Sequence, residues 1–177
     1  MVTLNNANPP PTSPAYTLRH AVRVILVDNQ GAILLLSTRD ASNPDFIPSW
    51  ELPGGGVQGE ERLTQTACRE IWEETGIHLD PATLSTPLWQ REVLYRYRGE
   101  YRRQFEQICR ATIAQSAPPI APARREPFEV EDHLAYRWWR VAELETTHAT
   151  LYPKSLGKHI AALLSGHSVD EAIEIWP

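Results

Sequence analysis

The sequence contains no apolar run near the roughly 18 residues that a helix needs to cross a bilayer. It also lacks a basic start followed by an apolar stretch, which is the pattern of a secretory signal. These two absences argue against a membrane partner and against export. We therefore expect a cytoplasmic protein.

Cysteine and positive charge are both scarce. Cys68 and Cys109 have neither metal-ligand spacing nor a neighbouring histidine cluster, so we expect two buried apolar thiols. The formal net charge is −5, whereas proteins that wrap long nucleic acid usually carry a broad basic surface. No long nucleic acid is expected as a partner, but a small phosphorylated ligand needs only a local basic site.

The order of sequence patterns indicates one domain with a flexible start. Residues 1–15 are rich in Asn, Pro and Ser and show no periodicity, which predicts a flexible arm. Docking of this arm on a neighbouring subunit is the alternative. Residues 16–177 have the length of a single domain.

Strand and helix patterns alternate along this domain. Apolar, β-branched runs at 21–27 and 32–36 flank turn residues and predict a hairpin. A second hairpin is predicted over 86–113, with its tight turn at Gly99 and Glu100, and a last strand over 134–140. Helices are predicted over 60–75, ending at Gly76, and over 154–165. The mixture predicts an α+β domain in which helices cover the faces of a sheet.

Three carboxylates occupy one face of the first predicted helix. Glu70, Glu73 and Glu74 are related as i, i+3 and i+4, so they lie side by side and repel one another. A hard cation removes this repulsion, and clustered carboxylate oxygens suit Mg²⁺ or Mn²⁺. A solvated acidic face is the alternative for the triplet alone. Arg69 can hold the carboxylates in fixed orientations, and the glycines at 54–56 allow close backbone approach, which together favour a metal site.

The stretch from Gly55 to Ile77 resembles the Nudix box, whose pattern is G-x5-E-x7-R-E-U-x-E-E-x-G-U, with U a bulky aliphatic residue. Every fixed position is met. The matching residues are Gly55, Glu61, Arg69, Glu70, Ile71, Glu73, Glu74, Gly76 and Ile77. A looser likeness extends to Trp50, to Pro53 and the glycines after it, and to the strand around residues 136–139.

The resemblance implies the Nudix fold, an α/β/α sandwich with a mixed β-sheet, in which the box forms a loop–helix–loop. It implies a metal-ligand set of Glu70, Glu73 and Glu74, to which the carbonyl of Gly54 or Gly55 adds an oxygen. Arg69, together with Glu61, would orient the glutamates. Glu74 and Glu73 would then be catalytic.

The implied reaction is Mg²⁺-dependent hydrolysis of a diphosphate bond in a nucleoside diphosphate derivative. A nucleoside triphosphate, oxidised or not, ADP-ribose and a nucleotide sugar all remain open as substrates. In this family the general base is a box glutamate or a glutamate from a later loop. Glu131 is our candidate in the acidic stretch 126–132, and an ordinary acidic loop is the alternative.

Substrate contacts and assembly are less determined by sequence. A turn at Gly99 and Glu100 would place Arg96, Arg98 and Arg103 on one hairpin face, where they could bind phosphates or simply be solvated. Trp50 is the aromatic candidate for stacking on a base. A homodimer is common in the family, and the apolar segment 173–176 could contribute to it. The competing hypothesis is a non-catalytic, nucleotide-sensing Nudix domain, against which the complete box argues.

Overall fold

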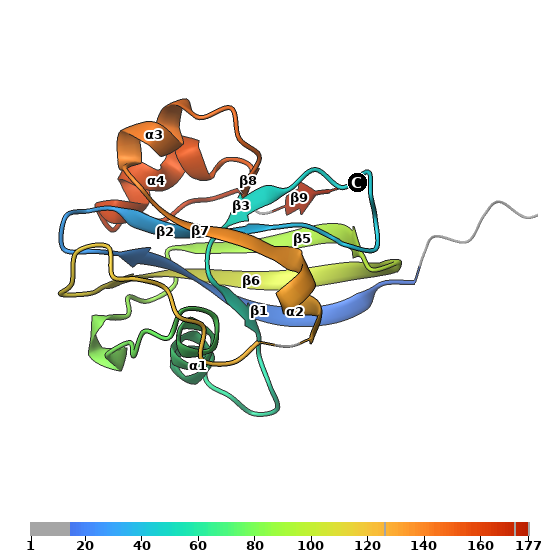
Figure 1. The fold of residues 1–177 in the computed structure, drawn as a ribbon, viewed down its shortest axis with the longest axis horizontal. Coiled ribbons are helices and arrows are strands. Elements are labelled where there is room, and N and C mark those ends of the chain that lie inside the picture. Colours follow the sequence, from blue (N-terminus) through green and yellow to red (C-terminus); the bar gives the residue numbers. More distant parts are fainter. Residues whose placement is uncertain (1–14, 126, 172, 177) are drawn as a thin grey trace, which may run out of the picture.

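The computed structural model describes residues 15–125, 127–171 and 173–176, so the expected arm at 1–15 falls almost entirely outside the described residues. The described chain forms a mixed sheet between two helical layers. α1 (Leu63–Thr75) lies on one face of the sheet, and α3 (Val141–Thr146) and α4 (Leu156–Leu164) lie on the other (Figure 1). This confirms the predicted α+β class and the α/β/α sandwich.

The sheet follows the order β8-β3-β2-β1-β6-β5-β9, with β4 paired to β1 and β7 paired to β2. Strand pairs β1–β6, β3–β8 and β5–β9 are parallel, and the other pairs are antiparallel. The strands are β1 (Thr17–Val27), β2 (Ile33–Thr38), β3 (Ser49–Glu51), β4 (Gly54–Gly56), β5 (Trp89–Tyr97), β6 (Glu100–Thr112), β7 (His133–Trp139), β8 (Leu151–Tyr152) and β9 (Ile173–Ile175). A 3₁₀ turn, η1 (Pro81–Thr83), and a short helix, α2 (Pro127–Asp132), complete the elements.

The central strand, β1, is buried on both faces because its alternate side chains enter two different cores. Ile25 joins the apolar cluster under α3 and α4, whereas Val24 and Leu26 join the cluster under α1. From the helices, Ile160 of α4 and Ile71 of α1 fill these two clusters. The helix that carries the box is thereby fixed to the middle of the sheet.

Three local predictions differ from the structure. The box helix begins at Leu63 and not at residue 60, because the chain turns at Gly59, whose φ is +54°. The expected glycine loop is partly a strand, since β4 pairs with β1. The acidic stretch after residue 126 contains α2 and is therefore not simply a loop.

The second hairpin forms as predicted, but its turn is displaced by one residue. Tyr97 pairs with Glu100, so Arg98 and Gly99 form the turn and both have positive φ. Arg96 accordingly faces Tyr101 and not Arg103, as the expected turn would have required. Over the described part of the chain, no helix is long and apolar enough to span a membrane.

Candidate active site

The box helix and strand β4 touch through two glutamates and two glycines. Glu74 is buried, and its Oε2 accepts a hydrogen bond of 2.8 Å from the backbone N–H of Gly54. Glu70 is also buried, and a Cβ added to Gly55 would lie 2.6 Å from its Oε1. Glycine is therefore needed at position 55 for the carboxylate of Glu70 to reach this place.

One guanidinium organises the remaining box glutamates. Arg69 donates to Glu61 from Nε at 2.7 Å, and its Nη1 donates to Glu70 at 2.7 Å and to Glu73 at 3.0 Å. Its Nη2 donates to the carbonyl of Gly56 at 2.8 Å. The hydrogen bonds from Arg69 lower the pKa of Glu61 to about 2. Arg69 thus contacts Glu61, Glu70 and Glu73 together.

Burial disfavours the charged forms of the two buried carboxylates. Burial raises the pKa of Glu74 well above its ordinary value, and the nearby Glu70 raises it further, while Arg23 opposes the shift. Burial likewise raises the pKa of Glu70. A divalent cation would supply positive charge, and carboxylate oxygens are the donors that Mg²⁺ and Mn²⁺ prefer. The residues present therefore fit such an ion.

Arg23 of β1 binds backbone carbonyls and carboxylates next to the box glutamates. Its Nη1 donates to the carbonyls of Leu52 at 3.0 Å and Gly54 at 3.1 Å, and it pairs with Glu51 at 3.0 Å. Its Nε donates to the fully buried Glu106 at 3.4 Å. The Gly54 carbonyl, which the resemblance suggests as a metal ligand, thus accepts a hydrogen bond from Arg23.

A cavity of about 800 Å³ opens over these groups. Box residues of β4 and α1 line one side, and residues of the β5–β6 hairpin and of α2 line other sides. Eight arginines line the cavity, so positively charged side chains suited to phosphate oxygens surround the acidic groups. These arginines are Arg19, Arg23, Arg39, Arg69, Arg96, Arg98, Arg102 and Arg124.

The structure brings many of the predicted site residues to this cavity. Gly54, Arg69, Glu70, Glu73 and Glu74 line it directly. Arg96 and Arg98, two of the predicted substrate contacts, also line it, and Arg98 pairs with the buried Asp132 at 3.0 Å. Glu61 acts on the cavity through Arg69.

Three other predicted residues lie elsewhere. Trp50 packs into the core under α3 and α4, with its ring centroid 5.2 Å from that of Trp139, because strand alternation turns it away from the cavity that its neighbours Ser49 and Glu51 line. Arg103 is outside the cavity wall and pairs with Glu92 at 2.7 Å. Glu131 has a side chain that is 64% exposed and pairs with Arg98 at 3.3 Å.

Two further side chains lie near Glu74: Glu129, which belongs to the acidic stretch noted in the sequence although Glu131 is the candidate chosen there, and His133, which the sequence does not indicate. Glu129 of α2 and His133 of β7 each offer an atom that, with a carboxylate oxygen of Glu74, forms a group within 4.8 Å. Glu129 lies in α2 and His133 begins β7, so no single helical or strand spacing in the sequence joins the two.

These features define a class of protein: a mixed α/β domain with clustered carboxylates beside a cavity that arginines line. The NUDIX domain family model matches residues 17–160. The chain therefore belongs to the Nudix family and is a Nudix hydrolase.

Relatives and solved structures agree with this assignment. An RNA pyrophosphohydrolase of Roseobacter denitrificans is 30% identical over 142 residues, covering 71% of this chain and 79% of that protein. Human m7GpppN-mRNA hydrolase NUDT17 is 41% identical over 76 residues, covering 42% of this chain and only 23% of its own length. A MutT protein of Methanosarcina mazei has the same fold, with a TM-score of 0.62 and 19% identity, over 86% of this chain and 99% of that one.

Proposed function

We propose that the protein hydrolyses a diphosphate bond in a nucleoside diphosphate derivative and depends on Mg²⁺, with Mn²⁺ as a substitute. The observation that carries the proposal is the pair of buried carboxylates, Glu70 and Glu74, facing a cavity with arginine-rich walls. An acidic pair alone would repel a diphosphate, and arginines alone would bind it without providing for hydrolysis. The two surfaces together suit a complex of a phosphorylated ligand and a cation.

Glu70, Glu73 and Glu74 would hold the cation, with Arg69 fixing their orientations. When bound, the metal would offset charge on the diphosphate oxygens and on the phosphorus that is attacked. Arg96 and Arg102 of the β5–β6 hairpin line the cavity and would bind phosphate oxygens on the substrate side. These contacts would position the diphosphate for attack by water.

A glutamate beside the site would take the proton from the attacking water. Glu129 has the better position for this role, because it lies within 4.8 Å of Glu74 at their nearest ligand atoms and lines the cavity. Glu131, our candidate from the sequence, points to solvent more than to the cavity. Mutating Glu129 and Glu131 separately would show which of the two is the base.

A second candidate substrate is the 5′-triphosphate end of RNA. The support comes from the relatives named RNA pyrophosphohydrolase, of which the Rhizobium meliloti protein is 30% identical over 81% of its length. The net charge of −5 argues against extended contact with an RNA backbone, so recognition would be confined to the phosphorylated end. The same acidic and basic groups would serve for either substrate.

One panel of substrates tests both candidates. Purified protein with Mg²⁺ is offered nucleoside triphosphates, an oxidised purine triphosphate, ADP-ribose, a nucleotide sugar and a 5′-triphosphorylated oligoribonucleotide, and the products are identified by mass. We expect metal-dependent release of a monophosphate with pyrophosphate or a second phosphorylated fragment. Binding without turnover of any member would favour the nucleotide-sensing alternative instead.

A further inference from the structure

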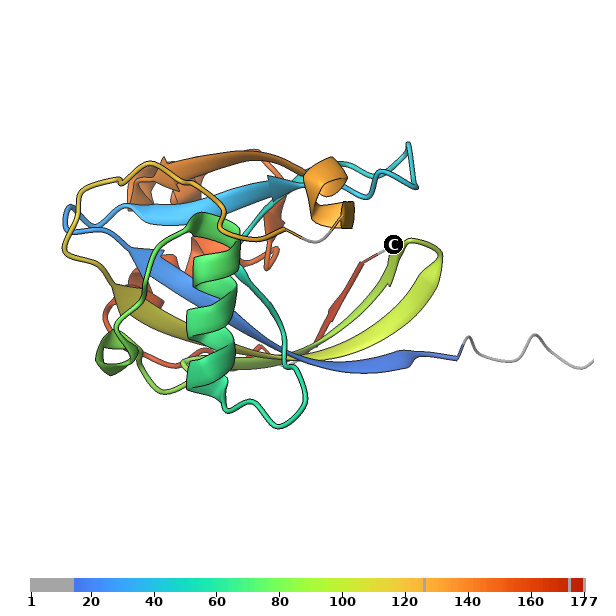
Figure 2. The ribbon, with the colours of Figure 1, turned by 60° about the horizontal axis from the view of Figure 1, so that its bottom comes forward.

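The residue that follows the last described strand, Trp176, forms part of the cavity wall. β9 runs parallel to β5, with Ile173 opposite Glu92 and Ile175 opposite Leu94, and the backbone N–H of Trp176 donates to the carbonyl of Leu94 at 2.8 Å. Figure 2 shows β9 alongside β5, on the side of the hairpin that faces α2. Trp176 lines the same cavity as the box glutamates.

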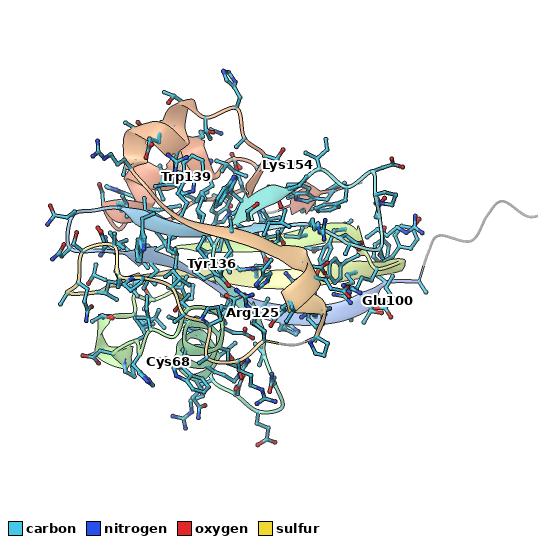
Figure 3. All side chains as sticks on the ribbon, in the orientation of Figure 1. Cys68, Glu100, Arg125, Tyr136, Trp139 and Lys154 are labelled. Atoms are coloured by element: carbon cyan, nitrogen blue, oxygen red, sulfur yellow. The ribbon has the colours of Figure 1, made fainter. Side chains whose placement is uncertain are left out.

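Buried charge fixes this strand in place. Arg91 is 4% exposed and donates to Glu174 of β9 at 3.0 Å, while its Nε donates to Glu106 at 2.7 Å. Lys154 donates to Glu174 from its backbone and, at 2.6 Å, to the carbonyl of Ile175 from its ammonium group. Figure 3 shows Lys154 at the upper side of the sheet, in the region where Figure 1 labels β3 and β9. The position of Trp176 is therefore set by interactions on both sides of the strand.

The indole of Trp176 presents an aromatic surface and not a free hydrogen-bond donor. Its ring centroid is 5.4 Å from that of Tyr152, and the Lys154 ammonium lies 4.6 Å from the ring centroid. Its Nε1 already donates to Glu174. The side chain is only half-buried, and Trp176 is among the residues that line the cavity.

A continuous series of contacts leads from this ring to the box. The hydroxyl of Tyr152 donates to Glu106 at 2.8 Å, Arg23 donates to Glu106 and to the Gly54 carbonyl, and Gly54 donates to Glu74. Trp176 and Glu74 thus lie at separate places in one cavity and are connected through this series of contacts. A ligand with its phosphates over the glutamates would extend its other end toward the indole.

We propose that Trp176 is a substrate-binding residue on which the nucleobase of the substrate stacks. The inference rests on the proposed function only in requiring that the ligand be a nucleotide. Because the indole N–H is already engaged, the contact would act through the ring face and would accept different bases, with purines favoured by their larger area. The strand β9 then positions a substrate-binding residue that lies outside the Nudix box.

Measuring the binding of product-like ligands tests the proposed stack on Trp176 without requiring turnover. Titration calorimetry with Mg²⁺ compares AMP with ribose 5-phosphate, which keeps the sugar and phosphate but has no base, on native protein, Trp176→Ala and Trp176→Phe. Trp72→Ala is the matched control, because Trp72 is an exposed tryptophan on α1 that does not line the cavity. Loss of a base–aromatic stack should weaken AMP binding by roughly ten-fold or more.

We expect Trp176→Ala to weaken AMP but leave ribose 5-phosphate unchanged, with Trp176→Phe recovering part of the affinity and Trp72→Ala behaving as native. If the panel identifies a nucleotide substrate, its KM should rise in Trp176→Ala while kcat changes little. Equal weakening of both ligands, an unchanged AMP affinity, or no AMP binding by native protein would overturn the inference. An affinity change that follows this pattern in a protein without turnover would support the stack and refute the proposed hydrolysis.

Discussion

The backbone N–H of Gly54 donates a 2.8 Å hydrogen bond to Oε2 of Glu74, joining strand β4 to the far end of the box helix. This bond holds a buried carboxylate against the cavity at a place where no lysine or arginine donates to it among the contacts of the described residues. The position of the carboxylate therefore does not depend on its charge.

Replacing Glu74 by Gln should keep the fold and remove the activity. The glutamine carbonyl can still accept from Gly54, but an amide is a much poorer ligand for a hard cation than a carboxylate. We expect kcat to fall by about a hundred-fold or more, as measured by steady-state rates on the substrate that the panel identifies. Glu145→Gln, on α3 across the sheet, is the control. Near-native rates in Glu74→Gln would contradict the ligand assignment.

Metal binding should strengthen as pH rises. The raised pKa values of Glu70 and Glu74 mean that the folded protein binds more protons than the unfolded chain, so without a cation these groups reduce stability as pH rises above 4.5. A cation competes with those protons and reverses the loss. The increase in Tm caused by Mg²⁺ should therefore be larger at pH 8 than at pH 5.5, and Glu74→Gln should flatten this difference. An equal increase at both pH values would count against the prediction.

Gly55→Ala should damage activity more than stability. The φ of Gly55 lies outside the left-handed region, so alanine meets no backbone strain there, but its Cβ would meet the Glu70 carboxylate at 2.6 Å. Displacing that carboxylate by even 1 Å should cost about a hundred-fold in rate. Gly31→Ala is the opposite control: φ is +81° and no atom lies within 4 Å, so it should lower Tm and leave the rate unchanged.

Mutating two glutamates of α2 separately should show which of them belongs to the site. Glu129 lies with Glu74 and His133, whereas Glu131 is mostly exposed. We expect Glu129→Gln to reduce kcat by at least ten-fold and to shift the acid limb of the pH–rate profile, and Glu131→Gln to change both by less than three-fold. The reverse ranking would restore Glu131 as the candidate base.

Glu61 should stabilise the protein in a defined pH window. Its pKa is about 2 in the folded chain because of Arg69, against an ordinary value of 4.5, so its contribution is complete above pH 4.5 and declines as pH falls toward 2. Glu61→Gln should lower the free energy of unfolding by about 1–2 kcal/mol at pH 6, after allowance for partial exposure, and by much less near pH 2. Urea titrations at several pH values measure this, with the exposed Glu60→Gln as control. A pH-independent difference would disprove the ionic origin.

The box could be predicted because its residues are close in sequence and one helix places them. Helical spacing alone brings Glu70, Glu73 and Glu74 to one face, and Gly76 ends the helix with φ of +74°, as expected. No comparable local rule joins Glu129 or Trp176 to Glu74, since each comes from an element far along the chain. Their places depend on how β7 and β9 pair in the sheet.

The hairpin turn is displaced by one residue because of tertiary contacts that the local sequence does not show. Non-glycine residues seldom adopt positive φ, so a turn at Gly99 and Glu100 appeared preferable to one at Arg98 and Gly99. Arg98 nevertheless has φ of +49°. Its backbone N–H donates to Asp40 at 2.8 Å and its guanidinium to Asp132 at 3.0 Å, and these tertiary bonds offset the strain.

The pairing of β1 with β6 also decides how the chain can fold. These central strands run parallel along their whole length, from Thr17 opposite Arg102 to Val27 opposite Thr112, so the middle of the sheet closes only when distant parts of the chain meet. Such non-local pairing slows folding, because loop-closure entropy is lost before contacts compensate for it. Before β6 pairs with it, β1 has an exposed, unpaired apolar edge that favours aggregation. Slow refolding, improved at low protein concentration, is the kinetic consequence of this topology.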